Sequence, residues 1–289
     1  MLTPDAGWIG MSRMAVLDAV AHHDLRVTVG QGAAFGDAVN EVPVFSTEIA
    51  EAQRDYPIVL RTDPEGRLRL VALLGFDRDE NLFLEGGQGR EQWQDRHIPL
   101  VLQRGPFLIG RPADRHADNG ADQSVDRDRE RGGDSGNDGT REGGAAGGRP
   151  PILLVDLDHP RIADAQGEPV FLPHGGHSPY LLHVIGVLRR IHEGTEATPS
   201  MIDSFVRAGL VEPLTLQVSL DATLRYDIPD CHVVSPALLA GATGETLAAL
   251  NRAGSLAAAF LIAHSLANIG KLIARKNRKR LASSQARAA

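Results

Sequence analysis

Residues 111–149 are a polar stretch that cannot build a hydrophobic core. The stretch reads RPADRHADNGADQSVDRDRERGGDSGNDGTREGGAAGGR, and Val125 is its only β-branched aliphatic residue. It contains no Leu, Ile or aromatic residue. Such a segment buries too little apolar surface to offset the conformational entropy lost on ordering. We therefore predict that residues 111–149 are disordered.

The sequence after this stretch indicates that it interrupts one domain instead of linking two. Ile152–Val155 is an apolar run, typical of a strand buried on both faces. Such a strand needs neighbours, and the sequence next to it offers only turns and then helices. We expect the strand to pair with strands before residue 111. The predicted organisation is an N-terminal extension at 1–22, a single domain at 23–275 with the insertion at 111–149, and a basic tail at 276–289.

The hydrophobic pattern predicts an α+β fold, with a mostly antiparallel sheet, several helices and a long C-terminal helix. Strands are expected at His23–Gly30, Ile58–Arg61, Leu68–Leu74, Asn81–Leu84, Ile152–Val155, Leu214–Leu220, Thr223–Tyr226 and Val233–Val234. Helices are expected at Thr47–Asp55 after an N-cap at Ser46, Ser178–Glu193, Pro199–Ala208 after an N-cap at Thr198, and Glu245–Lys276. The faces expected in the core carry Leu181, Leu182, Ile185, Leu188 and Ile191 on one helix and Leu247, Leu250, Phe260 and Leu261 on the last.

Composition and charge narrow the classes of partner. The chain of 289 residues has a net charge of −7 and 4% aromatic residues. A negative protein with few rings for base stacking is not expected to bind nucleic acid. The positive charge gathers in the last segment, KLIARKNRKRLASSQARAA, which has no acid. We interpret this segment as a solvated helix end, with weak contact to an anionic membrane surface as the alternative.

Two further features bear on localisation. The N-terminus, MLTPDAGWIGMSRMAVLDAV, lacks the basic start and apolar run of a Sec-type signal peptide. The most apolar run, Gly254–Gly270, is short for a membrane span and contains His264 and Asn268, which favours a buried core helix. Cys231 is the single cysteine, so no intramolecular disulfide is expected. These features predict a soluble, cytoplasmic protein.

Short motifs occur along the chain in an order that is specific as a set. They are Tyr56-Pro57-Ile58-Val59, Leu73-Leu74-Gly75, Glu80-Asn81-Leu82-Phe83, Trp93, Ile98-Pro99, Arg104-Gly105-Pro106-Phe107, Val155-Asp156, Gly167-Glu168-Pro169-Val170-Phe171, Arg252-Ala253-Gly254-Ser255-Leu256 and His264-Ser265-Leu266-Ala267-Asn268-Ile269. The ordered set, over about Asp24–Arg275, resembles the SapC family of bacterial proteins. Two departures are Gly105, where the family usually has an aromatic residue, and the long insertion.

The resemblance implies a cellular setting without naming a reaction. The family name comes from a bacterial surface-layer context, and in other bacteria such genes lie beside those for outer-membrane receptors and flavin-dependent halogenases. No catalytic set is carried over, and the chain has no Gly-x-Ser-x-Gly elbow or Walker A motif. We expect an accessory or binding protein with an unidentified protein or peptide partner, no cofactor, and an association with the bacterial surface that the resemblance alone suggests.

Carboxylates and imidazoles beyond Ile152–Val155 suggest the main alternative, a metal-dependent enzyme. Asp156 and Asp158 end the predicted strand, and His174 and His177 follow. Such groups can form a site of two histidines and one carboxylate, with Asp156, Asp158 and His174 at its centre. The competing interpretation is a strand-ending turn and a loop before a helix. We favour the turn and the loop, so no metal site is predicted.

Four polar residues are candidates for a cleft. His264 and Asn268 are four residues apart, share one helix face and are expected to be buried and hydrogen-bonded. Asn81 and Arg104 are the other two, and Asp156 is a further candidate for the same network.

Deleting residues 111–149 should leave the thermal unfolding midpoint nearly unchanged. Shortening a surface loop changes its closure entropy by only about 1 kcal/mol. Calorimetry of the intact and the shortened chain measures the difference. A large drop in the midpoint would show that the segment contributes to the folded core.

Overall fold

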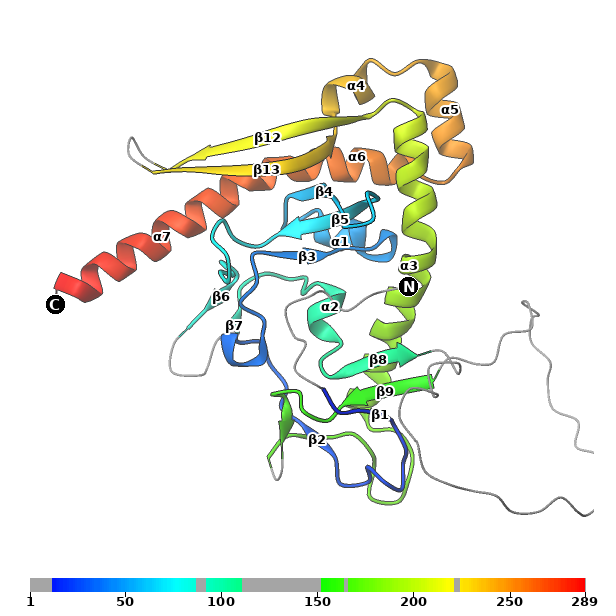
Figure 1. Cartoon of the computed structure of the whole chain (residues 1–289), viewed down its shortest axis with the longest axis vertical. Helices are drawn as coiled ribbons and strands as arrows, with labels where there is room; N and C mark the ends of the chain where they lie inside the picture. The colour runs from blue at the N-terminus through cyan, green and yellow to red at the C-terminus, as the bar shows by residue number, and fades with distance from the viewer. Residues whose placement is uncertain (1–11, 87–91, 111–151, 164–165, 221–223, 289) are drawn as a thin grey trace, which may run out of the picture.

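A 29-residue helix, α3 (Pro179–Arg207), runs along one side of the molecule and packs into two hydrophobic clusters (Figure 1). This computed structural model describes residues 12–86, 92–110, 152–163, 166–220 and 224–288. The predicted disordered stretch, 111–149, lies outside the described residues. Each of the two clusters combines residues from before and after that stretch. The first contains Ile58 and Phe205, and the second contains Phe107 and Val155.

The larger sheet has five antiparallel strands in the order β12-β13-β4-β5-β3. They are β3 (Glu41–Pro43), β4 (Ile58–Thr62), β5 (Leu68–Leu73), β12 (Val211–Ser219) and β13 (Arg225–Val234). The β4–β5 hairpin agrees with the prediction. The second hairpin is longer than expected, because Val233–Val234 belongs to β13 instead of forming a separate strand. β13 joins the early hairpin through Cys231 opposite Arg61 and His232 opposite Leu60.

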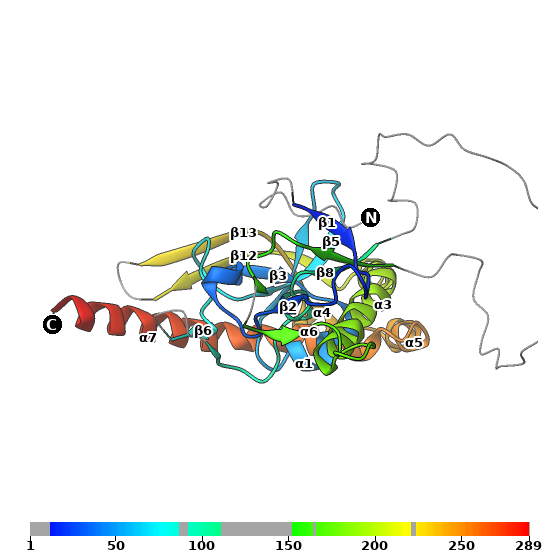
Figure 2. The same ribbon diagram turned by 90° about the horizontal axis from the view of Figure 1, so that it is seen from below.

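Short helices and the C-terminal helices pack against this sheet (Figure 2). The elements are η2 (Ser46–Glu48), α1 (Ile49–Ala52), α4 (Pro236–Ala240), α5 (Gly244–Arg252), α6 (Leu256–Ser265), η4 (Leu266–Asn268) and α7 (Ile269–Ala288). The far end of α7 extends away from the body in both views.

The second cluster lies beneath a small sheet in the order β1-β9-β8. Its strands are β1 (Met14–Val16), β8 (Phe107–Gly110) and β9 (Ile152–Asp156). β9 pairs antiparallel with both neighbours, so the pairing predicted for Ile152–Val155 is confirmed. β1 also takes part, although it falls within the predicted N-terminal extension. Around these sheets lie β2 (Arg26–Val27), η1 (Ala33–Phe35), β6 (Leu84–Glu85), β7 (Gln92–Trp93), α2 (Leu100–Gln103), β10 (Ile162–Ala163) and β11 (Glu168–Pro169).

The two helices predicted around Thr198 are one continuous helix. The helix begins where it was predicted, with Ser178 as its N-cap, but Pro199 lies in its interior. The Thr198 hydroxyl donates to Gly194 O at 2.5 Å and accepts from Ser46 N at 2.9 Å. Tertiary contact therefore holds the helix together at a proline that would otherwise favour a break.

The single long helix predicted for Glu245–Lys276 is instead divided, and its last part reaches Ala288. Gly254 adopts φ +69°, a left-handed conformation typical of a helix end. Ser255 N then donates to Leu250 O, which closes the end of α5. The chain turns at this point, and Leu250 is buried while Phe260 is 42% exposed, against the prediction for Phe260.

Three smaller predictions were also wrong. Ser46 does not cap a helix over Thr47–Asp55, because that segment forms only η2 and α1. The strand expected at Asn81–Leu84 is limited to β6, since Asn81 uses its side chain to shape a loop. Leu182 is 56% exposed because it lies on the outer side of α3.

By length and composition alone, Leu256–Gln285 passes as a candidate membrane span, which is weak evidence. About 33% of its most apolar window is buried inside the protein. Ser265 accepts from Ile58 N at 2.9 Å, and Asn268 donates to Gln53 O at 2.7 Å. These bonds tie the segment to the larger sheet and α1.

Gly194→Ala should destabilise the protein by about 1–3 kcal/mol, the usual range for overpacking. A Cβ at this position would lie 2.4 Å from Phe45 Cβ and 2.8 Å from Thr47 Oγ1. Gly186→Ala in the same helix is the matched control, because nothing lies within 4 Å of its Cβ position. It should stabilise by about 0.5–1 kcal/mol through helix propensity. Urea unfolding of both variants measures the difference, and equal effects would contradict the close packing at Gly194.

Candidate functional site: two buried polar clusters

The first polar cluster centres on the ion pair of Asp37 and Arg161, which come from opposite sides of residues 111–149. Their side chains are about 5% and 4% exposed, and Arg161 Nη2 lies 2.6 Å from Asp37 Oδ2. Arg161 also donates to Gly30 O, and its guanidinium lies 4.6 Å from the Phe35 ring centroid. Asp37 accepts from Gly32 N at 2.8 Å. The carboxylate and the guanidinium therefore neutralise each other and also bond to the backbone of the protein.

Asn81 extends this cluster toward the larger sheet. Its Nδ2 donates to Asp37 O at 2.8 Å, and its Oδ1 accepts from Phe83 N at 3.0 Å. Asn81 thus fixes the loop before β6 against the loop that carries Asp37. Both amide atoms of Asn81 are therefore used within the fold.

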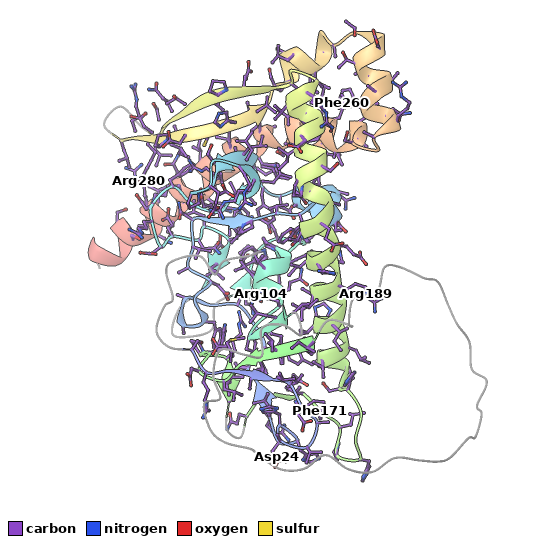
Figure 3. All side chains as sticks on the ribbon, turned by 45° about the vertical axis from the view of Figure 1, so that its right-hand side comes forward. Asp24, Arg104, Phe171, Arg189, Phe260 and Arg280 are labelled. Atoms are coloured by element: carbon purple, nitrogen blue, oxygen red, sulfur yellow. The ribbon has the colours of Figure 1, made fainter. Side chains whose placement is uncertain are left out.

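Arg104 and Asp156 lie beside the same cluster, around His159 (Figure 3 labels Arg104 near the middle of the molecule). Arg104 Nη1 donates to Phe107 O at 3.2 Å. His159 Nδ1 accepts from Arg161 N at 3.1 Å, so in the neutral imidazole the proton resides on Nε2. Burial lowers the pKa of Arg104, although the charge of Asp156 opposes this shift.

Burial near Arg161 makes two side chains harder to charge than they are in water. Burial, followed by the charge of Arg161, lowers the pKa of His159 to about 4, against the opposing effect of Asp156. Burial also raises the pKa of Tyr180 to about 12, with Arg161 opposing. The cluster therefore offers a neutral imidazole and a neutral phenol between arginines.

The second polar cluster is built on a fully buried carboxylate, Glu48. Glu48 Oε2 lies 2.9 Å from His97 Nε2 and accepts from Leu100 N at 2.9 Å. Its Oε1 accepts from Phe45 N at 3.3 Å. Sequence reasoning did not identify Glu48 as a buried group. No local sequence pattern reveals the role of Glu48, because two of its partners, His97 and Leu100, lie about 50 residues further along the chain.

Aromatic side chains enclose this second cluster. The Tyr56 hydroxyl donates to His97 O, and Trp93 Nε1 donates to the same carbonyl at 3.0 Å. Phe83 stacks against Trp93 with ring centroids 5.9 Å apart. Burial raises the pKa of Tyr56. A carboxylate–imidazole pair can support acid–base chemistry, but no Ser, Thr or Cys hydroxyl or thiol of the described ranges hydrogen-bonds to His97.

The four residues of the predicted cleft divide between different places. Asn81 and Arg104 lie at the first cluster, whereas Asn268 donates to Tyr56 O at 3.1 Å beside the second. His264 is exposed, so the prediction of its burial was wrong. The interrupted helix explains the difference, because η4 turns Asn268 inward after α6 has ended.

The residues of the metal alternative mostly serve local structure. Asp156 Oδ1 accepts from Asp158 N at 3.0 Å, which forms the turn after β9, and Asp158 Oδ2 accepts from Arg13 N at 2.8 Å. The ring of His177 lies near the ring of Phe171, and His174 is exposed in the preceding loop. Within the described ranges, no group of three or more His, Cys, Asp or Glu residues could hold a metal ion.

A shallow hollow of about 260 Å³ lies at the end of the molecule near β2, lined mainly by Val20–Leu25. Its polar groups are already engaged. His22 Nδ1 accepts from Asp18 N at 3.1 Å, and His23 Nδ1 lies 3.0 Å from Asp24 Oδ1. These two ring nitrogens are therefore used within the segment itself.

The start of the basic tail is held by acids instead of being solvated throughout. Lys276 is 6% exposed, and its Nζ lies 2.8 Å from Glu80 Oε1 and near Asp77. Arg275 Nη2 lies 2.8 Å from Asp95 Oδ2. Burial disfavours the charged ammonium, but hydrogen bonds to Asp77 and Glu80 raise the pKa of Lys276. Sequence alone could not reveal this pairing, because the acids lie about 200 residues earlier.

Comparison with known proteins places the chain in one family. A family model described as SapC matches residues 17–272, which is most of the chain. No curated protein matches the chain, and no solved structure matches it.

Lowering the pH from 7.5 to 5 should destabilise the protein partly through His159. The unfolded chain binds a proton at this residue near pH 6.5, whereas the folded protein does so only near pH 4. The unfolded state therefore binds more protons in this window, so stability falls as the pH is lowered through it. Urea midpoints at both pH values should fall less in His159→Gln than in the unmodified chain. An equal fall in both proteins would contradict this assignment.

Proposed function

Because this chain belongs to the SapC family, we propose that it is a non-catalytic accessory or binding protein of a bacterial surface or nutrient-uptake pathway. The observation that carries the proposal is the inward use of the motif side chains. Asn81 bonds to the Asp37 loop, Glu80 to Lys276, and Trp93 to the carbonyl of His97. A catalytic group must reach its substrate, and these groups instead fix one loop against another.

On this proposal the motif residues stabilise the fold, and residues on the protein surface bind the partner. Buried polar networks that are fully paired can fix one arrangement of a core at some cost in stability. A binding protein needs such a fixed surface more than it needs reactive groups. A protein or peptide partner fits this proposal, and no cofactor is required by it.

The rival proposal of a metal-dependent enzyme makes a distinct prediction. Elemental analysis of the purified chain would find a stoichiometric metal ion that is lost in Asp156→Ala but kept in Asp203→Ala, a control at an exposed position on α3. On our proposal neither protein carries such a metal. A tagged full-length chain should instead capture one partner reproducibly from its own cells, and the purified pair should bind in solution. Metal that depends on Asp156 would overturn the proposal.

Attachment to an anionic membrane through the basic tail remains a second alternative with its own test. A truncation that removes Lys276 would also break its ion pair with Glu80 and so disturb the fold as well as the tail. Co-sedimentation with anionic vesicles is better compared between the full chain and a chain ending at Lys279. On our proposal neither chain sediments with the vesicles. Sedimentation of the full chain alone would favour the membrane alternative.

A further inference from the structure

The small sheet β1-β9-β8 has two largely apolar faces, and the described part of the chain packs a hydrophobic cluster against one of them. On the inner face, Phe107 and Val155 are directly opposite each other and fully buried against the cluster that includes α3. Side chains alternate between the faces of a sheet. The next residue of each strand therefore faces the opposite side. The strand predicted to be buried on both faces is thus covered on one.

The outer face carries an apolar group that we call the outer patch. The register places Val16 opposite Leu154, and Leu154 opposite Leu108, so these three side chains share it. The complete patch is Met14, Val16, Leu108, Ile152 and Leu154. Met14 is 44% exposed and Val16 42% exposed, and none of the five belongs to either hydrophobic cluster.

Backbone geometry at Gly110 keeps the patch continuous. A Cβ on Gly110 would lie 2.6 Å from Leu154 Cδ1, so the Leu154 side chain extends across the glycine. The patch thus forms an apolar surface across three strands, and Asp156, opposite Met14, is the polar residue at one end of the same face. Covering such a surface with apolar side chains would remove it from water and lower the free energy of the folded chain.

We propose that residues 1–11 of the same chain provide this cover. The described chain begins at Ser12, two residues before Met14, so the segment is attached at the edge of the patch. Eleven residues reach up to about 35 Å, whereas three strands span only about 10–15 Å. The segment has suitable side chains, namely Leu2, Trp8, Ile9 and Met11.

Two other covers fit the patch less well. Residues 111–149 are also attached beside it, but they contain no Leu, Ile, Met or aromatic residue. A second copy of the chain would need a larger surface. Three strands of this length present on the order of 200 Å², whereas a stable interface buries about 800 Å² on each partner. A short segment that is already tethered needs far less area, because its association is intramolecular.

Tryptophan fluorescence tests the proposal, because Trp8 and Trp93 are the only tryptophans in the chain. In Trp93→Phe all emission comes from Trp8. We expect a blue-shifted emission that acrylamide quenches poorly. Adding Val16→Asp should shift the emission to the red and remove the protection. Adding Val206→Asp should change neither, because Val206 is 49% exposed on the distant end of α3.

Three results would overturn the proposal. Trp8 could be fully quenched in Trp93→Phe, or Val16→Asp could leave its protection unchanged. Protection that disappears on dilution would instead assign the cover to a second copy. If Trp93→Phe fails to fold, ¹⁹F spectra of the full chain containing 5-fluorotryptophan give the same comparison, with Trp8→Phe identifying the resonance. The proposal does not depend on the proposed function.

Discussion

The structure depends on the insertion of β9 between β1 and β8. This strand follows residues 111–149 in the sequence and pairs with two strands that precede them. Val155 lies opposite both Ala15 and Phe107. Without β9 the second hydrophobic cluster would lose Val155 and the strand that joins β1 to β8. Burial of apolar side chains at this position gives the free energy that fixes the path of the chain.

The pair of Asp37 and Arg161 makes a second connection across the same gap, of a different kind. Two buried charges lose most of their hydration, and their attraction often only balances that loss. Removing one partner is nevertheless expensive, because the other charge would be left buried. The pair therefore contributes more to the choice of arrangement than to total stability. Asn81 and His159 form hydrogen bonds to the backbone of the pair and so connect it to the neighbouring loops.

Sequence reasoning succeeded where the determinants are local and failed where they are distant. The β4–β5 hairpin follows from two apolar runs around a turn, and the start of α3 near Ser178 follows from the apolar face of the helix. The pairing of β9 followed from its need for neighbours. Pro199 misled the prediction, because contact with Ser46 holds α3 intact. Asp37, Glu48, His97 and Arg161 were missed because each acquires its role from a partner far away in sequence.

The unbroken course of α3 has a mechanical consequence. At about 1.5 Å per residue, its 29 residues form a rod of about 43 Å. Leu181 and Val184 anchor one end of the rod, and Ile202 and Phe205 anchor the other. A hinge between the two anchored ends would have to bend this rod, so a push on one end displaces the other as well. The length of α3 therefore sets the separation of the two hydrophobic clusters.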